Sequence, residues 1–283
     1  MSWPPRRILV GVDFSESSRA ALSAASGLAR RVGATLSLLH VVPDALLFSP
    51  SPEARAAASR RLSLLAEREA PPGTDFHVRK GDPTLELVAL RDLGDFDLVV
   101  TGAGHMRSMG RFVLGSVAGK LLGYPGAPLL IVASTPSGGE FKRILIAQEN
   151  PRVTSPWQKI GLALAHAERG EVALLHVLPP RGYLSDRHHV DLEPQRAPSR
   201  LCAQLAKLDP TVPAQVVIRQ GEAGNEIAVA ARELDVHLVV LGAERNRPDH
   251  GPGPVVNRIA RSGVPALLVI WPERESDEEF AEH

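Results

Sequence analysis

Glycines, serines and basic residues gather in one stretch, TGAGHMRSMGRFVLGSVAGK (residues 101–120), whose chemistry suits a phosphate chain. Its start, GAGHMR, approaches the dinucleotide fingerprint G-x-G-x-x-G, but Arg107 stands at the third glycine position. Its end, GSVAGK, approaches a P-loop, but only three residues separate its glycines, and Leu121 stands where the Mg-binding Ser or Thr belongs. Neither template fits, so a phosphate site in this stretch must be of another kind.

Two copies of one domain position this stretch, because the chain repeats its segments in the same order. RILVGVDF at Arg7 returns as RILIAQEN at Arg143, and LVVTGAG at Leu98 returns as LVVLGAE at Leu238. LLHVVP and GAPLLIV also return, as LLHVLP and GVPALLVI. The Pro, Ser and Gly residues of TPSGGE are typical of a linker. The repeats predict one domain over residues 1–138, a second over 139–273 and an acidic tail over 274–283.

Short apolar runs alternate with helical stretches inside each copy. ILVGV, TLSLLHVV, DLVVTG and PLLIVA are continuous, which is typical of strands buried on both faces of a parallel sheet. The stretch from Ser15 to Val32 carries apolar residues at helical spacing and stops at Gly33, a typical helix end. This pattern predicts the α/β fold class, with each domain a five-stranded parallel sheet that carries helices on both faces.

Ligands of such sheets bind beyond the carboxyl ends of the strands, which here are Asp13 after the first strand and the glycine loop after the fourth. The Asp13 carboxylate can accept hydrogen bonds from ribose hydroxyls or hold a hydrated cation. Gly102 and Gly104 remove side chains where the backbone must approach a ligand. Gly115 and Ser116 open the last helix, whose free amides and positive dipole end favour an anion. These residues favour a phosphate chain over a neutral ligand.

Several other polar residues allow two interpretations. Arg107 and Arg111 either reach the outer phosphates or remain solvated charges on the loop. His40 and His176 occupy the same register in both copies, which favours a structural role over a catalytic one. Residues 182–194 include His188, His189 and Asp191, but no second ligand cluster has matching spacing, so solvated side chains are favoured over a metal site.

Composition excludes some classes of function. The chain has 32 basic and 32 acidic residues, so no overall field attracts nucleic acid or an anionic membrane. No apolar run is long enough for a membrane span, and MSWPPRRILVGVD lacks the features of a signal peptide. The single cysteine, Cys202, allows no internal disulfide, which fits a cytoplasmic protein. We expect Cys202 to be a buried small apolar residue and not a reactive thiol.

The combination VGVDFSESSRAAL, LLHVV, VRKGDP, the loop from Gly102 to Ser116 with VAGKLL, and APLLIV resembles the universal stress protein family in its tandem form. The resemblance covers both repeats and implies Rossmann-like, adenine nucleotide alpha hydrolase-like domains. One subgroup of the family binds ATP through a loop G-x-x-G-x9-G-[ST], the Asp after strand one and a backbone contact after strand two. On this chain the resemblance, with the residue chemistry above, gives a site for ATP, with or without Mg²⁺, at Gly11, Val12, Asp13, Val41, Gly102, Gly104, His105, Arg107, Gly115, Ser116 and Val117.

The chain departs from the family's pattern in both copies. In the first, the second loop glycine should fall at position 105, where the chain has His105, with Gly104 one place early. In the second, the positions that correspond to Asp13, the second loop glycine and the Gly-Ser pair are Glu149, Arg245, Pro252 and Gly253. Proline lacks the backbone donor that a phosphate needs. The second domain is therefore predicted to bind ATP weakly or not at all.

Three functions remain open from sequence. The leading one is an ATP-binding regulatory protein of the stress response that pairs its two repeats through PLLIVAS and PALLVIW and acts on an unidentified protein partner. A nucleotide-free scaffold is the second, with His105 marking a loop that has lost its ligand. A slow ATPase is the third, because no obvious general base accompanies Asp13. The sequence also leaves open whether two tandem chains form a homodimer. Dinucleotide-dependent redox chemistry is disfavoured, because the glycine-rich turn follows the fourth strand of the domain and not the first.

Overall fold

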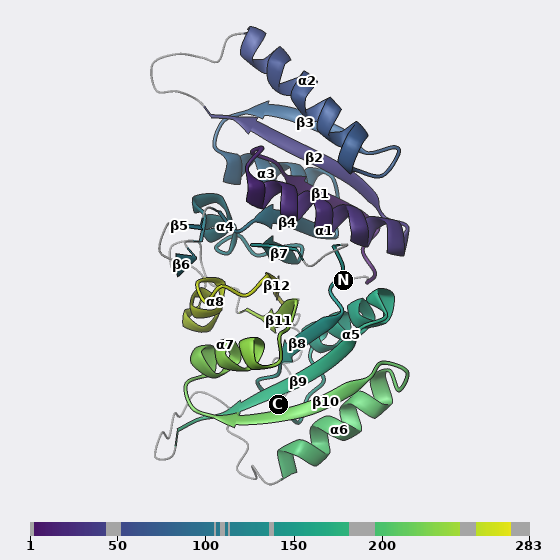
Figure 1. The fold of residues 1–283 in the computed structure, drawn as a ribbon, viewed down its shortest axis with the longest axis vertical. Coiled ribbons are helices and arrows are strands. Elements are labelled where there is room, and N and C mark those ends of the chain that lie inside the picture. The colour runs from purple at the N-terminus through teal and green to yellow at the C-terminus, as the bar shows by residue number, and fades with distance from the viewer. Residues whose placement is uncertain are drawn as a thin grey trace, which may run out of the picture.

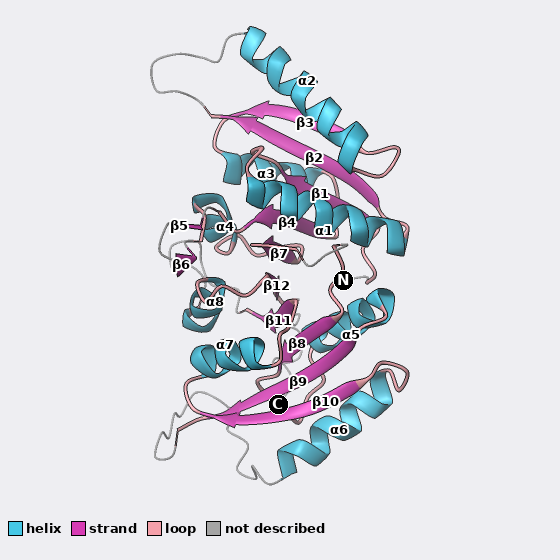
Figure 2. Ribbon diagram, viewed as in Figure 1, coloured by secondary structure: helices cyan, strands magenta, loops and turns pink. Residues whose placement is uncertain are grey.

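The computed structural model describes residues 3–43, 52–104, 106–107, 111–112, 114–135, 139–180, 196–243 and 253–272. One sheet runs through both repeats in the order β10-β9-β8-β11-β12-β7-β4-β1-β2-β3, with helices on both of its faces (Figure 1, Figure 2). The predicted α/β fold class is confirmed, and each repeat contributes five parallel strands to the sheet.

In the first repeat, β1 and β4 are neighbours, so the ends of both strands open at one edge of the sheet. Its strands are β1 (Arg7–Gly11), β2 (Thr35–Val42), β3 (Asp75–Lys80), β4 (Leu98–Gly102) and β7 (Leu129–Val132). Its helices are α1 (Glu16–Val32), α2 (Pro52–Glu69), α3 (Pro83–Leu93) and α4 (Ser116–Leu121). A small antiparallel hairpin, which the sequence did not predict, joins β5 (Met106–Arg107) to β6 (Arg111–Phe112) between β4 and α4.

The second repeat copies this order without a counterpart of the hairpin among its described residues. Its strands are β8 (Arg143–Ala147), β9 (Glu171–Leu178), β10 (Ala214–Gln220), β11 (Leu238–Gly242) and β12 (Ala266–Ile270). Its helices are α5 (Pro156–Glu168), α6 (Ala197–Leu208), α7 (Ala223–Glu233) and α8 (Pro254–Ala260). Residues 136–138 of the expected linker and the acidic tail over 274–283 lie outside the described residues.

The sheet separates two apolar cores, which explains why its strands read as continuous apolar runs. In β1, Ile8 and Val10 belong to the core under α1, α2, α5 and α6, whereas Leu9 belongs to the core under α3, α4, α7 and α8. Successive side chains of a strand point to opposite faces, so burial of both faces requires apolar residues at every position. Figure 1 shows the same division, with these two groups of helices on opposite sides of the sheet.

Local signals set the limits of α1. Ser15 caps its start by accepting a hydrogen bond from the Ser18 N–H at 3.2 Å, and Gly33 ends it with φ 71°. A left-handed residue at this position costs glycine no Cβ clash, which is why the helix stops there. The sequence therefore predicted both ends of this helix.

The two repeats join through their last strands. β7 and β12 pair antiparallel, with Leu130 opposite Leu268 at the centre of the continuous sheet. Ala133 and Ser134 extend the contact by donating their N–H groups to the carbonyl of Pro265. The paired strands are buried along their whole length, so each repeat covers an edge that would otherwise be open to other strands.

A buried ion pair adds a second link between the repeats. Arg31, in the last turn of α1, donates Nη2–H to Oε1 of Glu168 at 2.5 Å and to the carbonyl of Gly139 at 3.3 Å. Glu168, at the end of α5, also accepts the Phe141 N–H on Oε2 at 3.2 Å. The Glu168 side chain is fully buried. Both of its oxygens are thus used to fix the segment that connects the repeats.

Cys202 does not lie where the sequence analysis expected it. The expectation of a buried residue is wrong, because Cys202 is exposed on α6. The buried face of this helix is formed by Ala197, Leu201 and Leu205, spaced four residues apart, and the next position along the helix turns away from that face. Within the described residues, no helix is long and apolar enough to cross a membrane.

Candidate functional site

A cavity of about 450 Å³ lies at the carboxyl ends of β1, β2 and β4 in the first repeat. We call it the first-repeat cavity. The structure gathers here most of the residues that the sequence singled out, from segments up to about a hundred residues apart. They are Gly11, Val12, Asp13, Val41, Gly102, Gly104, Gly115, Ser116 and Val117.

A tight turn holds the Asp13 carboxylate between β1 and α1. Its Oδ1 accepts hydrogen bonds from the backbone N–H of Ser15 at 2.9 Å and from the Ser15 hydroxyl at 2.5 Å. Phe14, between them, has φ 64°, a conformation uncommon for a bulky residue. The guanidinium of Arg61 lies 4.1 Å from the centre of the Phe14 ring, and the His40 ring lies at 4.6 Å. These contacts hold the strained turn and so fix the direction of the carboxylate.

Glycines allow three backbone segments to meet beside Asp13. A Cβ on Gly102 would lie 2.7 Å from the backbone carbonyl carbon of Ser17 in α1. A Cβ on Gly115 would lie 3.1 Å from Cα of Gly104, and the Gly115 N–H donates to the Ala103 carbonyl at 2.7 Å. One side of the cavity is therefore a cradle of closely packed backbone.

The opposite wall of the cavity is apolar, and the sequence analysis missed it. Leu39 stands two residues before Val41 on β2 and faces the same side, while Pro83 and Leu87 come from the start of α3. The alternation of side chains along β2 was a usable signal for Leu39. Nothing in the sequence places α3 over the cavity before the fold is known. Ser17, Ser18 and Thr101, which bear hydroxyl groups, also line the cavity and were missed in the same way.

The structure describes only part of the predicted loop. His105 lies outside the described residues, and so does Arg245 of the second repeat. Arg107 and Arg111 are placed opposite each other in the β5–β6 hairpin by their backbone only. The described parts of the loop between Gly104 and Gly115 are thus β5 and β6, which run antiparallel to each other.

The universal stress protein family matches the chain twice, over residues 5–133 and 140–269. The chain belongs to this family. The two matches cover both repeats, so this universal stress protein is a tandem form.

Relatives and solved structures agree with this assignment. The chain is 27% identical over 160 residues to the stress response protein NhaX of Bacillus subtilis, a match that covers 44% of this chain and 96% of the relative. A universal stress protein structure from Archaeoglobus fulgidus matches with a TM-score of 0.72 at 17% identity and covers 94% of this chain and 98% of its own. A functionally unknown Pseudomonas aeruginosa protein matches with a TM-score of 0.69 at 16% identity, over 95% and 93% of the two chains. The last two similarities show the shared fold.

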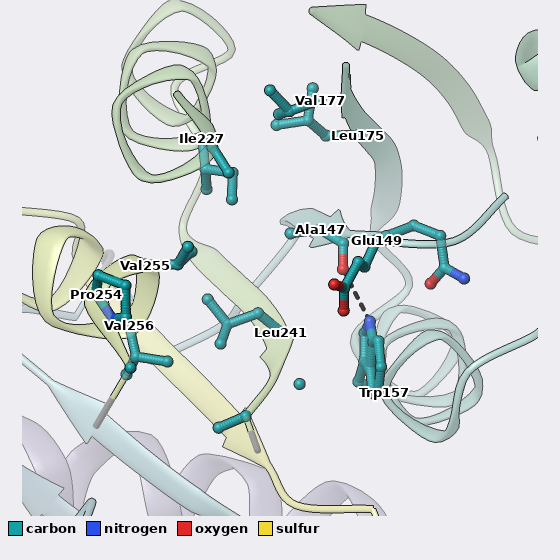
Figure 3. Close-up of a pocket in the computed structure, with 15 residues that line it drawn as sticks. Ala147, Glu149, Trp157, Leu175, Val177, Ile227, Leu241, Pro254, Val255 and Val256 are labelled. Carbon is teal, nitrogen blue, oxygen red and sulfur yellow. Dashed lines mark hydrogen bonds between the residues drawn. The ribbon is translucent and has the colours of Figure 1, made fainter. Parts of the chain in front are cut away.

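The second repeat of this universal stress protein has its own cavity in the corresponding place, with a volume of about 520 Å³ (Figure 3). We call it the second-repeat cavity. Glu149 lines it where Asp13 lines the first, as the repeat predicted. The expected match of Gly-Ser to Pro252 and Gly253 is wrong by one residue. Gly253 is the N-cap of α8 as Gly115 is of α4, so Pro254 takes the place of Ser116.

His40 and His176, which occupy the same position in the two repeats, make equivalent contacts. His40 Nδ1 lies 2.7 Å from the Val12 carbonyl, and His176 Nδ1 lies 2.9 Å from the Gln148 carbonyl. A carbonyl only accepts, so Nδ1 donates in both repeats. Each histidine ties the end of the first strand of its repeat to the second strand, which is the structural role that the sequence favoured.

Metal binding finds no support in the part of the chain that the structure describes, where no group of three or more His, Cys, Asp or Glu side chains could hold an ion. His188, His189 and Asp191 lie outside the described residues.

Asp82 links α3 to α4, the helix that carries Ser116. Its Oδ1 accepts the N–H groups of Thr84 and Leu85 at 2.8 and 3.2 Å, and its Oδ2 accepts from Lys120 Nζ at 3.1 Å. Burial acts to raise the pKa of Asp82, but the hydrogen bonds from Lys120 and the two amides outweigh it, so the pKa lies below its ordinary value. The Asp82 carboxylate therefore stabilises the folded protein at pH values above its ordinary pKa. This stabilisation is lost as the pH falls through the lowered pKa.

We expect Asp82→Ala to lower the free energy of unfolding by about 1 kcal/mol, because α3 loses its N-cap. Asp82→Asn is the matched control. Its amide oxygen still caps the helix, and the exposed ion pair with Lys120 contributes little, so it should cost less than about 0.5 kcal/mol. Urea denaturation of both variants measures the difference. Equal losses would show that the ion pair, and not the cap, carries the contribution.

Proposed function

We propose that this universal stress protein binds ATP, with or without Mg²⁺, in the first-repeat cavity and acts as a regulatory protein of the stress response. The observation that carries the proposal is the meeting of Asp13, the backbone cradle and the start of α4 around one cavity. Membership of the universal stress protein family supports the role in stress response.

The lining of the cavity suits the parts of a nucleotide. Leu39, Val41 and Leu87 form an apolar wall for a planar base. The Asp13 carboxylate lines the same cavity and would accept hydrogen bonds from the ribose hydroxyls. At the start of α4, the N–H groups of Ser116 and Val117 have no acceptor within the helix, because the first turn of any helix leaves its donors free for an anion.

The size and shape of the cavity fit such a ligand. About 450 Å³ lies within the range of roughly 300–1,000 Å³ that is usual for small-molecule sites. The glycine cradle brings backbone donors close to the ligand with no side chain between them. Mg²⁺, when bound, would neutralise part of the phosphate charge, and oxygen ligands such as the Asp13 carboxylate are of the kind it prefers.

We do not expect this protein to hydrolyse ATP rapidly. Asp13 is engaged by Ser15 in a turn that fixes its direction, which suits a positioning role. The nucleotide would instead act as a regulator, by changing the loop between Gly102 and Ser116 and with it a surface that a protein partner contacts. We further propose a cytoplasmic location, which fits a chain with one cysteine.

Titration of the purified protein with ATP, with and without Mg²⁺, tests the proposal. We expect saturable binding that Asp13→Ala weakens about 10- to 100-fold, because a hydrogen bond to a charged group contributes about 1.5–3 kcal/mol. Glu149→Ala, the same change in the second repeat, is the matched control and should leave the affinity unchanged. Absence of binding at millimolar ATP would refute the proposal and favour the nucleotide-free scaffold.

A further inference from the structure

The connection between β1 and α1 is short and carries the Asp13 carboxylate. Phe14 alone stands between Asp13 and Ser15, the residue that caps α1. The Ser15 hydroxyl accepts the Ser18 N–H and donates to Asp13 Oδ1, so the carboxylate is tied directly to the start of the helix. In this connection Phe14 has φ 64°, a left-handed conformation that is unfavourable for a bulky residue. Any contact that holds Phe14 therefore also acts on Asp13.

The second repeat makes the same connection in another way. Between Glu149 and the cap Ser155 stand residues 150–154, all of which the structure describes, and none of them has a positive φ. The Ser155 hydroxyl donates to Oε1 of Gln148 at 2.7 Å, whereas the Ser15 hydroxyl donates to the carboxylate that lines its cavity. The left-handed residue is therefore not a requirement of the repeat's fold. It is found in the repeat that carries the proposed nucleotide site.

Two side chains from other elements hold the Phe14 ring. The guanidinium of Arg61, on α2, lies 4.1 Å from the ring centre. The His40 ring, on β2, lies 4.6 Å from it, and His40 is itself fixed because its Nδ1 donates to the Val12 carbonyl at 2.7 Å. Phe14 also packs against the apolar core under α1 and α2. The strained turn thus leans on β2 through a histidine and on α2 through an arginine.

Arg61 reaches the site through Phe14. No residue of α2 is among the described residues that line the first-repeat cavity. Figure 1 shows this helix over β2 and β3, at the outer end of the sheet. A cation over an aromatic face is attracted to it, and the flat guanidinium of arginine stacks there well. Such contacts offset the cost of a left-handed residue, which persists where its surroundings favour it.

From these observations we propose that Arg61 is a positioning residue for the nucleotide site, which holds Phe14 and so keeps the Asp13 carboxylate in the orientation that the ligand needs. This assignment rests on the proposed binding of ATP in the first-repeat cavity. It adds that α2, a helix outside the cavity wall, sets the affinity of the site. Without the contact, Asp13 would spend part of its time turned away from the ligand, and binding would weaken.

Titration of Arg61→Gln with ATP measures this effect. We expect the affinity to fall about 3- to 5-fold, which is the size of one exposed cation–π contact. Arg60→Gln is the matched control, because it removes the same charge from a position about 100° away around the helix. Its effect should stay below about 1.5-fold, since salt screens exposed charges. An unchanged affinity in Arg61→Gln, or an equal fall in both variants, would overturn the assignment.

Double substitutions show whether Arg61 acts through the turn. Phe14→Leu keeps an apolar side chain there but removes the ring, and on its own it should weaken ATP binding at least about 3-fold. Adding Arg61→Gln to Phe14→Leu, or to Asp13→Ala, should then weaken binding no further, because residues that act through one another are not additive. A full 3- to 5-fold loss that persists in either background would mean that Arg61 attracts the phosphates directly, contrary to a positioning role.

NMR relaxation of the ligand-free protein separates this assignment from the proposal of ATP binding. In Arg61→Gln we expect the order parameters of the Phe14 and Ser15 N–H groups to fall from about 0.85, the value of a rigid backbone, towards about 0.6. Arg60→Gln should leave them unchanged. Unchanged order parameters in Arg61→Gln would refute the positioning role even if the wild type binds ATP. A wild type that does not bind ATP would instead refute the proposed function, and the role of Arg61 at that site with it.

Discussion

Ser116→Glu is expected to abolish ATP binding, with a loss of affinity of about 100-fold or more, equivalent to about 3 kcal/mol. Ser116 is the first residue of α4 and lines the first-repeat cavity next to Gly115. A carboxylate there would repel the phosphates of the proposed ligand. The same carboxylate is favourable for the helix itself, because acidic residues stabilise the first turn. Binding should therefore be lost without a loss of stability, which isothermal titration and thermal denaturation can show together.

Pro254→Glu is the control for this experiment, since Pro254 is the first residue of α8 in the second repeat. We expect it to leave ATP affinity within about 2-fold of that of the wild type. Binding that survives Ser116→Glu but is lost in Pro254→Glu would move the nucleotide site to the second repeat. Gly115→Pro is a less informative variant, because it also removes the N–H that Gly115 donates to the Ala103 carbonyl.

The repeat and the strand pattern allowed much of the fold to be predicted. Continuous apolar runs identified the strands because both faces of the sheet are buried, as Ile8 and Leu9 show. Ser15 and Gly33 marked the ends of α1 through purely local chemistry. The structure supplies the strand order, in which β1 and β4 are neighbours, and this pairing brings Asp13 and Gly102 to one cavity.

The features that could not be predicted depend on how segments distant in the sequence pack against one another. The match at Gly253 was missed because the stretch from the start of the helix to the next strand is one residue shorter in the second repeat, from Pro254 to Ala266, than in the first, from Ser116 to Leu129, so counting back from that strand gave the wrong residue. Trp157 was not singled out from the sequence, because nothing in the sequence places Gly242 and the Ala147 carbonyl beside it. Cys202 depended on the rotation of α6, which is set by packing against the sheet.

Glu168→Ala is expected to lower the free energy of unfolding by about 3 kcal/mol. The substitution leaves the Arg31 guanidinium without its carboxylate, and it leaves the Phe141 N–H without an acceptor in a buried place. Glu69→Ala is the matched control in the same chain. The Glu69 pair with Arg19 is exposed to solvent, so its loss should cost less than about 1 kcal/mol. Urea denaturation should show both values, and equal losses would contradict a structural link at Glu168.

The pH dependence of Glu168 gives a further check of the same link. Burial raises the pKa of Glu168, and Arg31 and the Phe141 N–H only partly oppose it, while the nearby Glu140 adds to the rise. The folded protein therefore holds this proton more tightly than the unfolded chain does. The resulting contribution to stability is present below the ordinary pKa of a glutamate and is lost as the pH rises through the raised one. Because Glu168→Gln cannot titrate, the stability of the wild type relative to this variant should fall as the pH rises from the ordinary glutamate pKa of 4.5 through the raised pKa of Glu168. A relative stability that rises over this interval would mean that Arg31 outweighs burial and that the carboxylate is the form the fold prefers.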